Sequence, residues 1–181
     1  APSGRIDAAR PVVRGAPRKG GAWIVALNRA AETEGLAPGE ALASARAKAL
    51  DLQARPADPE ADAAALGHLA LWCLRYTPLV TPWSEREGAD GLFLDIAGCA
   101  HLFGGEDCLL ADLGRRLHGF DFAPRLAIAD TAGASWAVAR YGKTDSAIVP
   151  GGAEARALHS LPLAALRLDE NARATLGRLG F

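Results

Sequence analysis

The feature that most restricts the fold is an alternation of helical and strand patterns that starts after residue 57. Asp58-Pro59-Glu60 combines an N-cap acid, a proline at the first helical position and a second acid in the first turn, and apolar residues follow at helical spacing to Leu74. Strand and helical patterns then alternate, in the order 92–96, 107–118, 126–129, 132–141 and 147–149. This order predicts an α/β (α+β) fold in which helices cover a small sheet.

Shorter patterns flank this alternation. Before it, the sequence predicts a strand at 23–27, a helix at 28–35 capped by Asn28, a helix at about 38–49 and an extended segment at 52–55. After it, residues 153–181 look like two short helices joined at Leu161-Pro162. We therefore expect three regions, which are 1–57, 58–152 and 153–181.

Cysteine and methionine usage bear on the compartment and on the chain's start. Three cysteines at irregular spacing predict free thiols in a reducing cytoplasm. Cys73 falls in an apolar stripe, so we expect it to be buried. The sequence contains no methionine, so we expect the natural start to lie upstream or to have been removed. No apolar run approaches the ~18 residues of a membrane-spanning helix.

The net charge of −1 conceals an uneven distribution. Residues 1–55 contain nine Lys and Arg against five Asp and Glu, residues 56–112 two against ten, and residues 113–181 nine against six. The acidic middle would repel phosphate, and no continuous basic stripe is present, so we expect weak DNA binding.

Residues 88–105, GADGLFLDIAGCAHLFGG, contain the candidate metal ligands. Asp90 and Asp95 are five apart, which in a strand places them on opposite faces, so they cannot share a metal as a pair. Cys99, His101 and Cys108 are possible zinc ligands, but a structural zinc site needs four, usually from two closely spaced pairs. We favour a loop role for His101. The residues alone indicate an α/β domain without an intact active site.

Several segments together resemble the Y-family, or translesion, DNA polymerases of the UmuC and DinB type. WIVALNRAAETEGL (23–36) resembles their fingers strand and helix, RYTPLV (75–80) the start of their palm, and LFLDIAGC (92–99) a palm strand. DIAGCAHLFGGE and IADTAGASWAVARYG are similar to the ImuB branch, which is encoded in bacterial damage-inducible mutagenesis cassettes. The resemblance implies fingers at 1–57, a palm with a ferredoxin-like sheet at 58–152, and the start of a helical thumb at 153–181.

The resemblance also implies which residues would form an active site. Family polymerases bind two Mg²⁺ with an Asp-Glu pair before the palm strand and an Asp from the first palm strand. Here the pair reads Asp90-Gly91, and the other Asp would lie upstream of residue 1. Arg29 and Glu32 stand where the family's Tyr and Arg clasp the triphosphate, and only Lys143 keeps a matching charge. We therefore expect no cofactor, with Asp90 as a vestigial metal ligand and Lys143 and Arg29 as vestigial phosphate ligands.

The expected function follows from the same resemblance. Residues 167–171, RLDEN, lack the glycines with which the family's thumb hairpin meets a DNA phosphate. The ImuB branch implies a non-catalytic scaffold that brings together an error-prone C-family polymerase, a RecA-like accessory protein and the sliding clamp, through contacts beyond residue 181. One alternative is a weakly active polymerase that uses Mg²⁺, Asp90, an upstream Asp and a substitute acid such as Asp95. The other is a simple DNA-binding module with Arg29 and the basic ends as contacts.

The resemblance places the family's first palm strand upstream of residue 1 and in the middle of the palm sheet. Without it, the strands at 92–96 and 126–129 would expose unpaired backbone groups and apolar side chains. We expect an upstream segment, a neighbouring chain or a partner to fill the gap. Finding these two strands in separate sheets would contradict the palm assignment.

Overall fold

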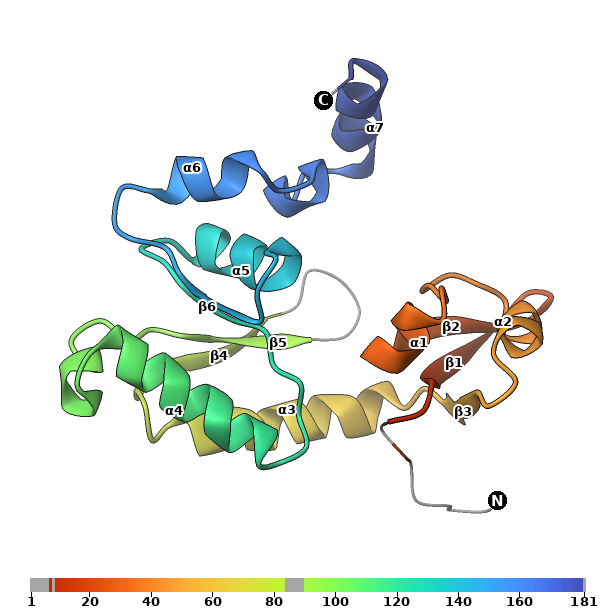
Figure 1. Ribbon diagram of the computed structural model, residues 1–181, viewed down its shortest axis with the longest axis horizontal. Helices are drawn as coiled ribbons and strands as arrows, with labels where there is room; N and C mark the ends of the chain where they lie inside the picture. Colours follow the sequence, from red (N-terminus) through yellow and green to blue (C-terminus); the bar gives the residue numbers. More distant parts are fainter. Residues whose placement is uncertain (1–6, 8, 84–89, 181) are drawn as a thin grey trace. The chain divides into compact units, whose positions relative to one another are not determined.

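The computed structural model describes residues 7, 9–83 and 90–180, and the chain forms two compact units, Ala1–Ala65 and Leu66–Phe181 (Figure 1). The division falls inside helix α3 (Pro59–Cys73), eight residues after the fingers–palm boundary that we placed at 57/58. Asp58 caps this helix as predicted, because its Oδ1 accepts a hydrogen bond from the Ala61 N–H at 3.0 Å. Within the described part of the chain, no helix combines the length and the apolar character that crossing a bilayer requires.

The first unit is built on a three-stranded sheet in the order β2–β1–β3. Strand β1 (Val12–Arg18) pairs antiparallel with β2 (Gly21–Leu27) and parallel with β3 (Gln53–Pro56). Helices α1 (Arg29–Thr33) and α2 (Leu42–Lys48) lie between β2 and β3 in the chain. The core of this unit consists of Val13, Ile24, Ala31, Leu36, Ala45 and Ala49.

Asn28 links helix α1 to the sheet. Its Oδ1 accepts from the Ala31 N–H at 3.0 Å, which confirms the predicted N-cap, and from the Val12 N–H at 2.9 Å. Its Nδ2 donates to the Arg10 carbonyl at 2.9 Å. One side chain therefore fixes both the start of the helix and the start of β1, and the chain leaves the helix through Gly35, whose φ of +75° favours glycine.

The second unit contains two small sheets between helices. Strand β4 (Val80–Trp83) pairs antiparallel with β5 (Gly91–Leu94), and β6 (Leu126–Ile128) pairs parallel with β7 (Ser146–Ile148). Helix α4 (Glu106–His118) and the second half of α3 cover one side of these strands, and α5 (Ala132–Tyr141) covers the other (Figure 1). A 3₁₀ turn, η1 (Ala100–Phe103), precedes α4.

Strands β5 and β6 lie in separate sheets, so the expectation that they share one sheet is wrong. The helix-covered α/β character is as predicted, and the difference concerns strand pairing alone. Among the described residues, no strand pairs with both β5 and β6. The family resemblance implies a third strand between them, and two strands that both bond to a third do not bond to each other.

Helix α4 supplies the apolar centre of the second unit. Leu109, Leu113 and Leu117 recur every four residues and are buried against Tyr76. The Tyr76 hydroxyl donates to the Asp112 carboxylate at 2.7 Å, and Arg116 donates to the same carboxylate at 2.7 Å. Burial, followed by the hydrogen bond and charge of Asp112, raises the pKa of Tyr76 to about 12.

The apolar face predicted for helix α3 is confirmed at Cys73 and is wrong at Leu74. Cys73 is buried and is a free thiol, and burial raises its pKa. Leu74, predicted on the same face, is 48% exposed. The helix is apolar nearly all round, so periodicity alone could not identify its buried face.

The last residues form three short helical segments, α6 (Glu154–His159), η2 (Leu163–Leu166) and α7 (Glu170–Arg178). The first two cover α5 (Figure 1). Asp169 caps α7, because its Oδ1 accepts from the Ala172 N–H at 2.8 Å. This acid in the RLDEN segment thus has a structural role at a helix start.

Candidate active site

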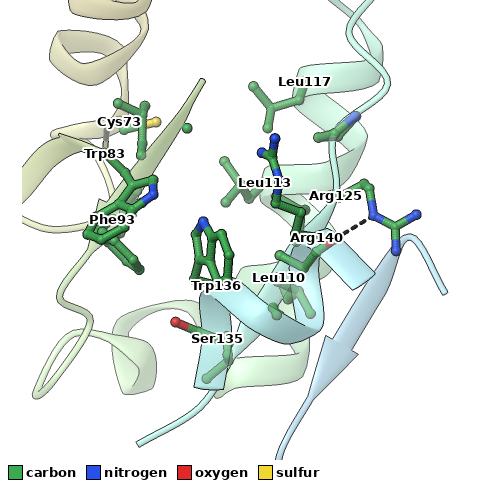
Figure 2. Close-up of a pocket in the computed structure, with 18 of the residues that line it drawn as sticks. Cys73, Trp83, Phe93, Leu110, Leu113, Leu117, Arg125, Ser135, Trp136 and Arg140 are labelled. Atoms are coloured by element: carbon green, nitrogen blue, oxygen red, sulfur yellow. Dashed lines mark hydrogen bonds between the residues drawn. The ribbon is translucent and has the colours of Figure 1, made fainter. Parts of the chain in front are cut away.

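A cleft of about 560 Å³ lies between β5 and β6 in the second unit. Residues of both strands line it, and among the described residues no strand bonds to both. Figure 2 shows Trp136 of α5 facing Trp83 and Phe93, with Leu110, Leu113 and Leu117 of α4 along another wall. The walls are therefore mainly apolar, which suits a buried segment of chain better than a charged ligand.

Aromatic side chains join α5 to the β4–β5 hairpin at one end of this cleft. Trp83 lies edge-on to Phe93 with ring centroids 5.1 Å apart, and 6.3 Å from the ring of Trp136. Arg167 is the residue after η2, and its guanidinium lies 5.0 Å from the Trp83 ring and 5.6 Å from the Trp136 ring. These contacts hold the hairpin, α5 and η2 together.

Asp90, the candidate metal ligand, lies directly before β5 and is bound by a cation of the protein. The Nη1 group of Arg140, in the last turn of α5, donates to Oδ2 of Asp90 in an ion pair. Burial lowers the pKa of Arg140, but the hydrogen bond and charge of Asp90, together with Tyr141, raise it overall. Each side chain is 50% exposed, so solvent screening limits the pair to about 1 kcal/mol of stability or less.

Asp95 hydrogen-bonds to residues close to its own strand. Its carboxylate accepts from the Ala97 N–H at 3.0 Å, one residue before Gly98, and its carbonyl accepts from the buried Thr77 hydroxyl. The structure gives Asp90 and Asp95 separate partners. Asp95 therefore organises the turn that leaves β5.

The donor set at Asp90 does not fit a pair of Mg²⁺ ions. The next residue is Gly91, which has no carboxylate, and Asp90 already accepts from Arg140. Over residues 7, 9–83 and 90–180, no three His, Cys, Asp or Glu residues are grouped as metal ligands, and this includes Cys99, His101 and Cys108. Two divalent cations need several oxygen ligands to offset their charge.

The candidate phosphate ligands belong to different units. Arg29 and Glu32 are exposed, one turn apart on α1 of the first unit. Lys143 is exposed in the second unit, just after Gly142 ends α5. Each unit thus presents its own candidate residues at its surface.

Comparison with known proteins decides the relationship. No protein-family model matches the chain. Over 147 residues, 81% of the chain, it is 51% identical to ImuB of Caulobacter vibrioides, in each of two strains. This chain is a homologue of ImuB. It spans 31% of the length of these curated relatives, which is less than a third.

Solved structures show the same fold. DinB from Sulfolobus solfataricus matches with a TM-score of 0.68 at 14% identity, over 94% of this chain and 50% of DinB. The insertion ternary complex of Dbh DNA polymerase matches with a TM-score of 0.64 at 14% identity, over 94% of this chain and 51% of Dbh. A Dbh–Dpo4 chimera of the Y family matches with a TM-score of 0.57 at 12% identity, over 82% of this chain and 44% of the chimera.

These matches confirm the Y-family polymerase fold, although β5 and β6 lie in separate sheets. Separate sheets were therefore the wrong criterion for rejecting the palm assignment. Among the described residues no strand bonds to both β5 and β6, and the fold matches the Y-family structures all the same.

Sequence reasoning missed the residues that surround Asp90. Arg140, Trp136 and Arg167 entered it only as parts of longer strings, and Trp83 did not enter it. One signal was available, because Trp136 and Arg140 are four apart in a predicted helix and must share a face. Their partner Trp83 is far away in sequence, and only the fold brings it close.

Proposed function

We propose that this chain is the fingers, palm and start of the thumb of a Y-family-like protein that does not itself add nucleotides to DNA. The observation that carries the proposal is Gly91, which stands where active relatives are expected to have the second metal-binding carboxylate. Phosphoryl transfer by two metals depends on ions about 4 Å apart, held by several carboxylates. A lone Asp90 in an ion pair supplies too little negative charge.

The triphosphate side supports the same proposal independently. Glu32 occupies a position at which the resemblance implies an arginine, and it is exposed on α1. An acid close to a triphosphate replaces a charge-assisted hydrogen bond with repulsion, a difference on the order of several kcal/mol. Restoring an acid at position 91 would therefore leave Glu32 in place, and replacing Glu32 would leave Gly91.

The positive role that we propose is a scaffold in bacterial translesion synthesis and mutagenesis induced by DNA damage, in the cytoplasm. It would bring together an error-prone C-family polymerase, a RecA-like accessory protein and the sliding clamp. Homology to ImuB supports this role. The polymerase fold supports a location at a primer terminus, with weak DNA contact through residues 1–181.

A pull-down tests the scaffold role. The full-length protein and residues 1–181 would each carry the same tag and be mixed with the three purified partners. We expect the full-length protein to retain all three partners and the shorter chain to retain fewer, because the contacts lie beyond residue 181. Retention of none of them by the full-length protein would contradict the proposal.

A further inference from the structure

The ion pair between Arg140 and Asp90 is built into the fold by contacts on both sides. The two residues are 50 positions apart in the sequence. Trp136, one turn before Arg140 on the same helical face, packs against Trp83, and Trp83 is paired in register with Gly91, the neighbour of Asp90. The aromatic contacts therefore bring the guanidinium to the carboxylate.

A second arginine fixes the end of the helix that carries Arg140. Arg125, just before β6, donates to the carbonyls of Ala139 and Gly142 and, at 3.4 Å, to that of Thr144. It therefore satisfies carbonyls that a helix end leaves without partners. The last turn of α5 also favours a cation such as Arg140, because the helix dipole is negative there.

We propose that Arg140 takes the place of a divalent cation at Asp90 and that it, together with the missing acid at position 91, keeps metal away from this site. The proposal rests on the proposed non-catalytic function and names the residue that enforces it. A guanidinium satisfies a carboxylate with directed hydrogen bonds and stays charged at any physiological pH. A metal ion must therefore displace a resident cation and also bind beside its positive charge.

The structure has room to restore the acid. A side-chain Cβ built at Gly91 meets no atom within 4 Å, and Gly91 does not have a positive φ. Gly91→Glu should therefore be accommodated without strain. With Arg140 present, the new carboxylate gains a cationic partner that can bind two carboxylate groups, so the acid alone should not create a metal site.

Binding of Mn²⁺, followed by the electron paramagnetic resonance signal of the free ion, tests the proposal. The proteins compared are the unaltered full-length protein and its Gly91→Glu, Arg140→Gln and Gly91→Glu/Arg140→Gln variants. We expect the first three proteins to bind Mn²⁺ with a Kd above about 1 mM, and the double variant to bind Mn²⁺ at least about tenfold more tightly than Gly91→Glu. Equal binding by Gly91→Glu and the double variant would overturn the proposal.

A matched control separates a local effect from a general change in charge. Arg115 is 69% exposed on α4 and is paired with Asp112, so Gly91→Glu/Arg115→Gln removes the same charge elsewhere in the unit. We expect this variant to bind Mn²⁺ like Gly91→Glu alone, and an equal gain in affinity would overturn the role of Arg140. Tight Mn²⁺ binding by the unaltered protein that Asp90→Asn abolishes would instead count against the non-catalytic function.

A second measurement does not depend on the folding of the double variant. In the unaltered protein, nuclear magnetic resonance should show slowed proton exchange and restricted rotation at the Arg140 guanidinium. Asp90→Asn should reverse both effects while leaving the amide spectrum of α4 unchanged. A guanidinium signal that Asp90→Asn does not alter would overturn the proposal.

Discussion

Leu113→Ala should measure whether the cleft between β5 and β6 is filled by another segment of the full-length protein. Leu113 is buried against Tyr76 on one side and borders the cleft of about 560 Å³ on the other. Truncation to Ala removes three carbon atoms, a transfer loss of about 2.4 kcal/mol at ~0.8 kcal/mol per buried group. Leu→Ala changes in closed cores reach about 5 kcal/mol, because a new void adds to this loss.

The magnitude therefore depends on what occupies the cleft. In residues 1–181 the vacated space joins an existing cleft, so we expect a loss of about 2–3 kcal/mol of unfolding free energy. In a chain extended upstream with its natural sequence, a strand in the cleft should make the same truncation leave an enclosed void, with a loss of about 4–5 kcal/mol. Urea unfolding followed by tryptophan fluorescence measures both values.

Ile24→Ala provides the control for this comparison. Ile24 is buried in the core of the first unit and does not border the cleft, so its loss should be the same in both chains. Equal losses for Leu113→Ala in the shorter and the extended chain would refute the reasoning that an upstream strand fills the cleft.

Three further predictions concern nucleotide, the β5 turn and pH. Calorimetry should detect only weak dNTP binding by the full-length protein and stronger binding by the Arg29→Tyr/Glu32→Arg double variant. Micromolar dNTP binding by the unaltered protein would contradict the vestigial phosphate site. Thr77→Val should lower the unfolding free energy by about 1–3 kcal/mol, because the Asp95 carbonyl loses the hydroxyl that donates to it and the Leu79 N–H loses its acceptor at 3.1 Å. A change near zero in urea unfolding would show that water replaces these bonds. The pKa of Tyr76 is raised to about 12, so the contribution of the protonated hydroxyl to stability is fully present below pH ~10 and is lost as the pH rises towards 12. Between these pH values the unfolding free energy of Tyr76→Phe should fall less than that of the unaltered protein, and an equal fall in both would contradict the raised pKa.

Local signals in the sequence predicted much of the fold. The caps Asn28 and Asp58 and the four-residue spacing of leucines in α4 indicate elements that form where expected. Such signals act within a few residues and depend little on the rest of the chain.

Strands β1 and β4 could not be predicted in the same way. Gly15 and Pro17 interrupt the apolar alternation of β1, and its parallel pairing joins Val12–Gly15 to residues 53–56. Strand β4 contains Pro82, which argues against a central strand but is tolerated in a two-stranded hairpin. Only pairing with distant residues makes these segments strands.

Some residues of the candidate site could likewise be predicted from local motifs, and others could not. Gly91 and Glu32 could be assigned from their positions in motifs, because each motif lies within one element and its flank. The partner of Asp90 could not, since Arg140 is one of 20 lysines and arginines and only the packing of α5 selects it. The family resemblance implied exposed apolar side chains beside 92–96 and 126–129, whereas the volume of the cleft and the helices that line it required the structure.

Primer extension by the full-length protein tests the central claim most directly. Purified protein at high concentration would be incubated with primer–template DNA, all four dNTPs and either Mg²⁺ or Mn²⁺, beside its Gly91→Glu variant and an active Y-family polymerase. We predict no extension by either form of this protein, because the phosphate side stays altered when the acid is restored. Extension by the unaltered protein that depends on metal and is lost in Asp90→Asn would contradict the account.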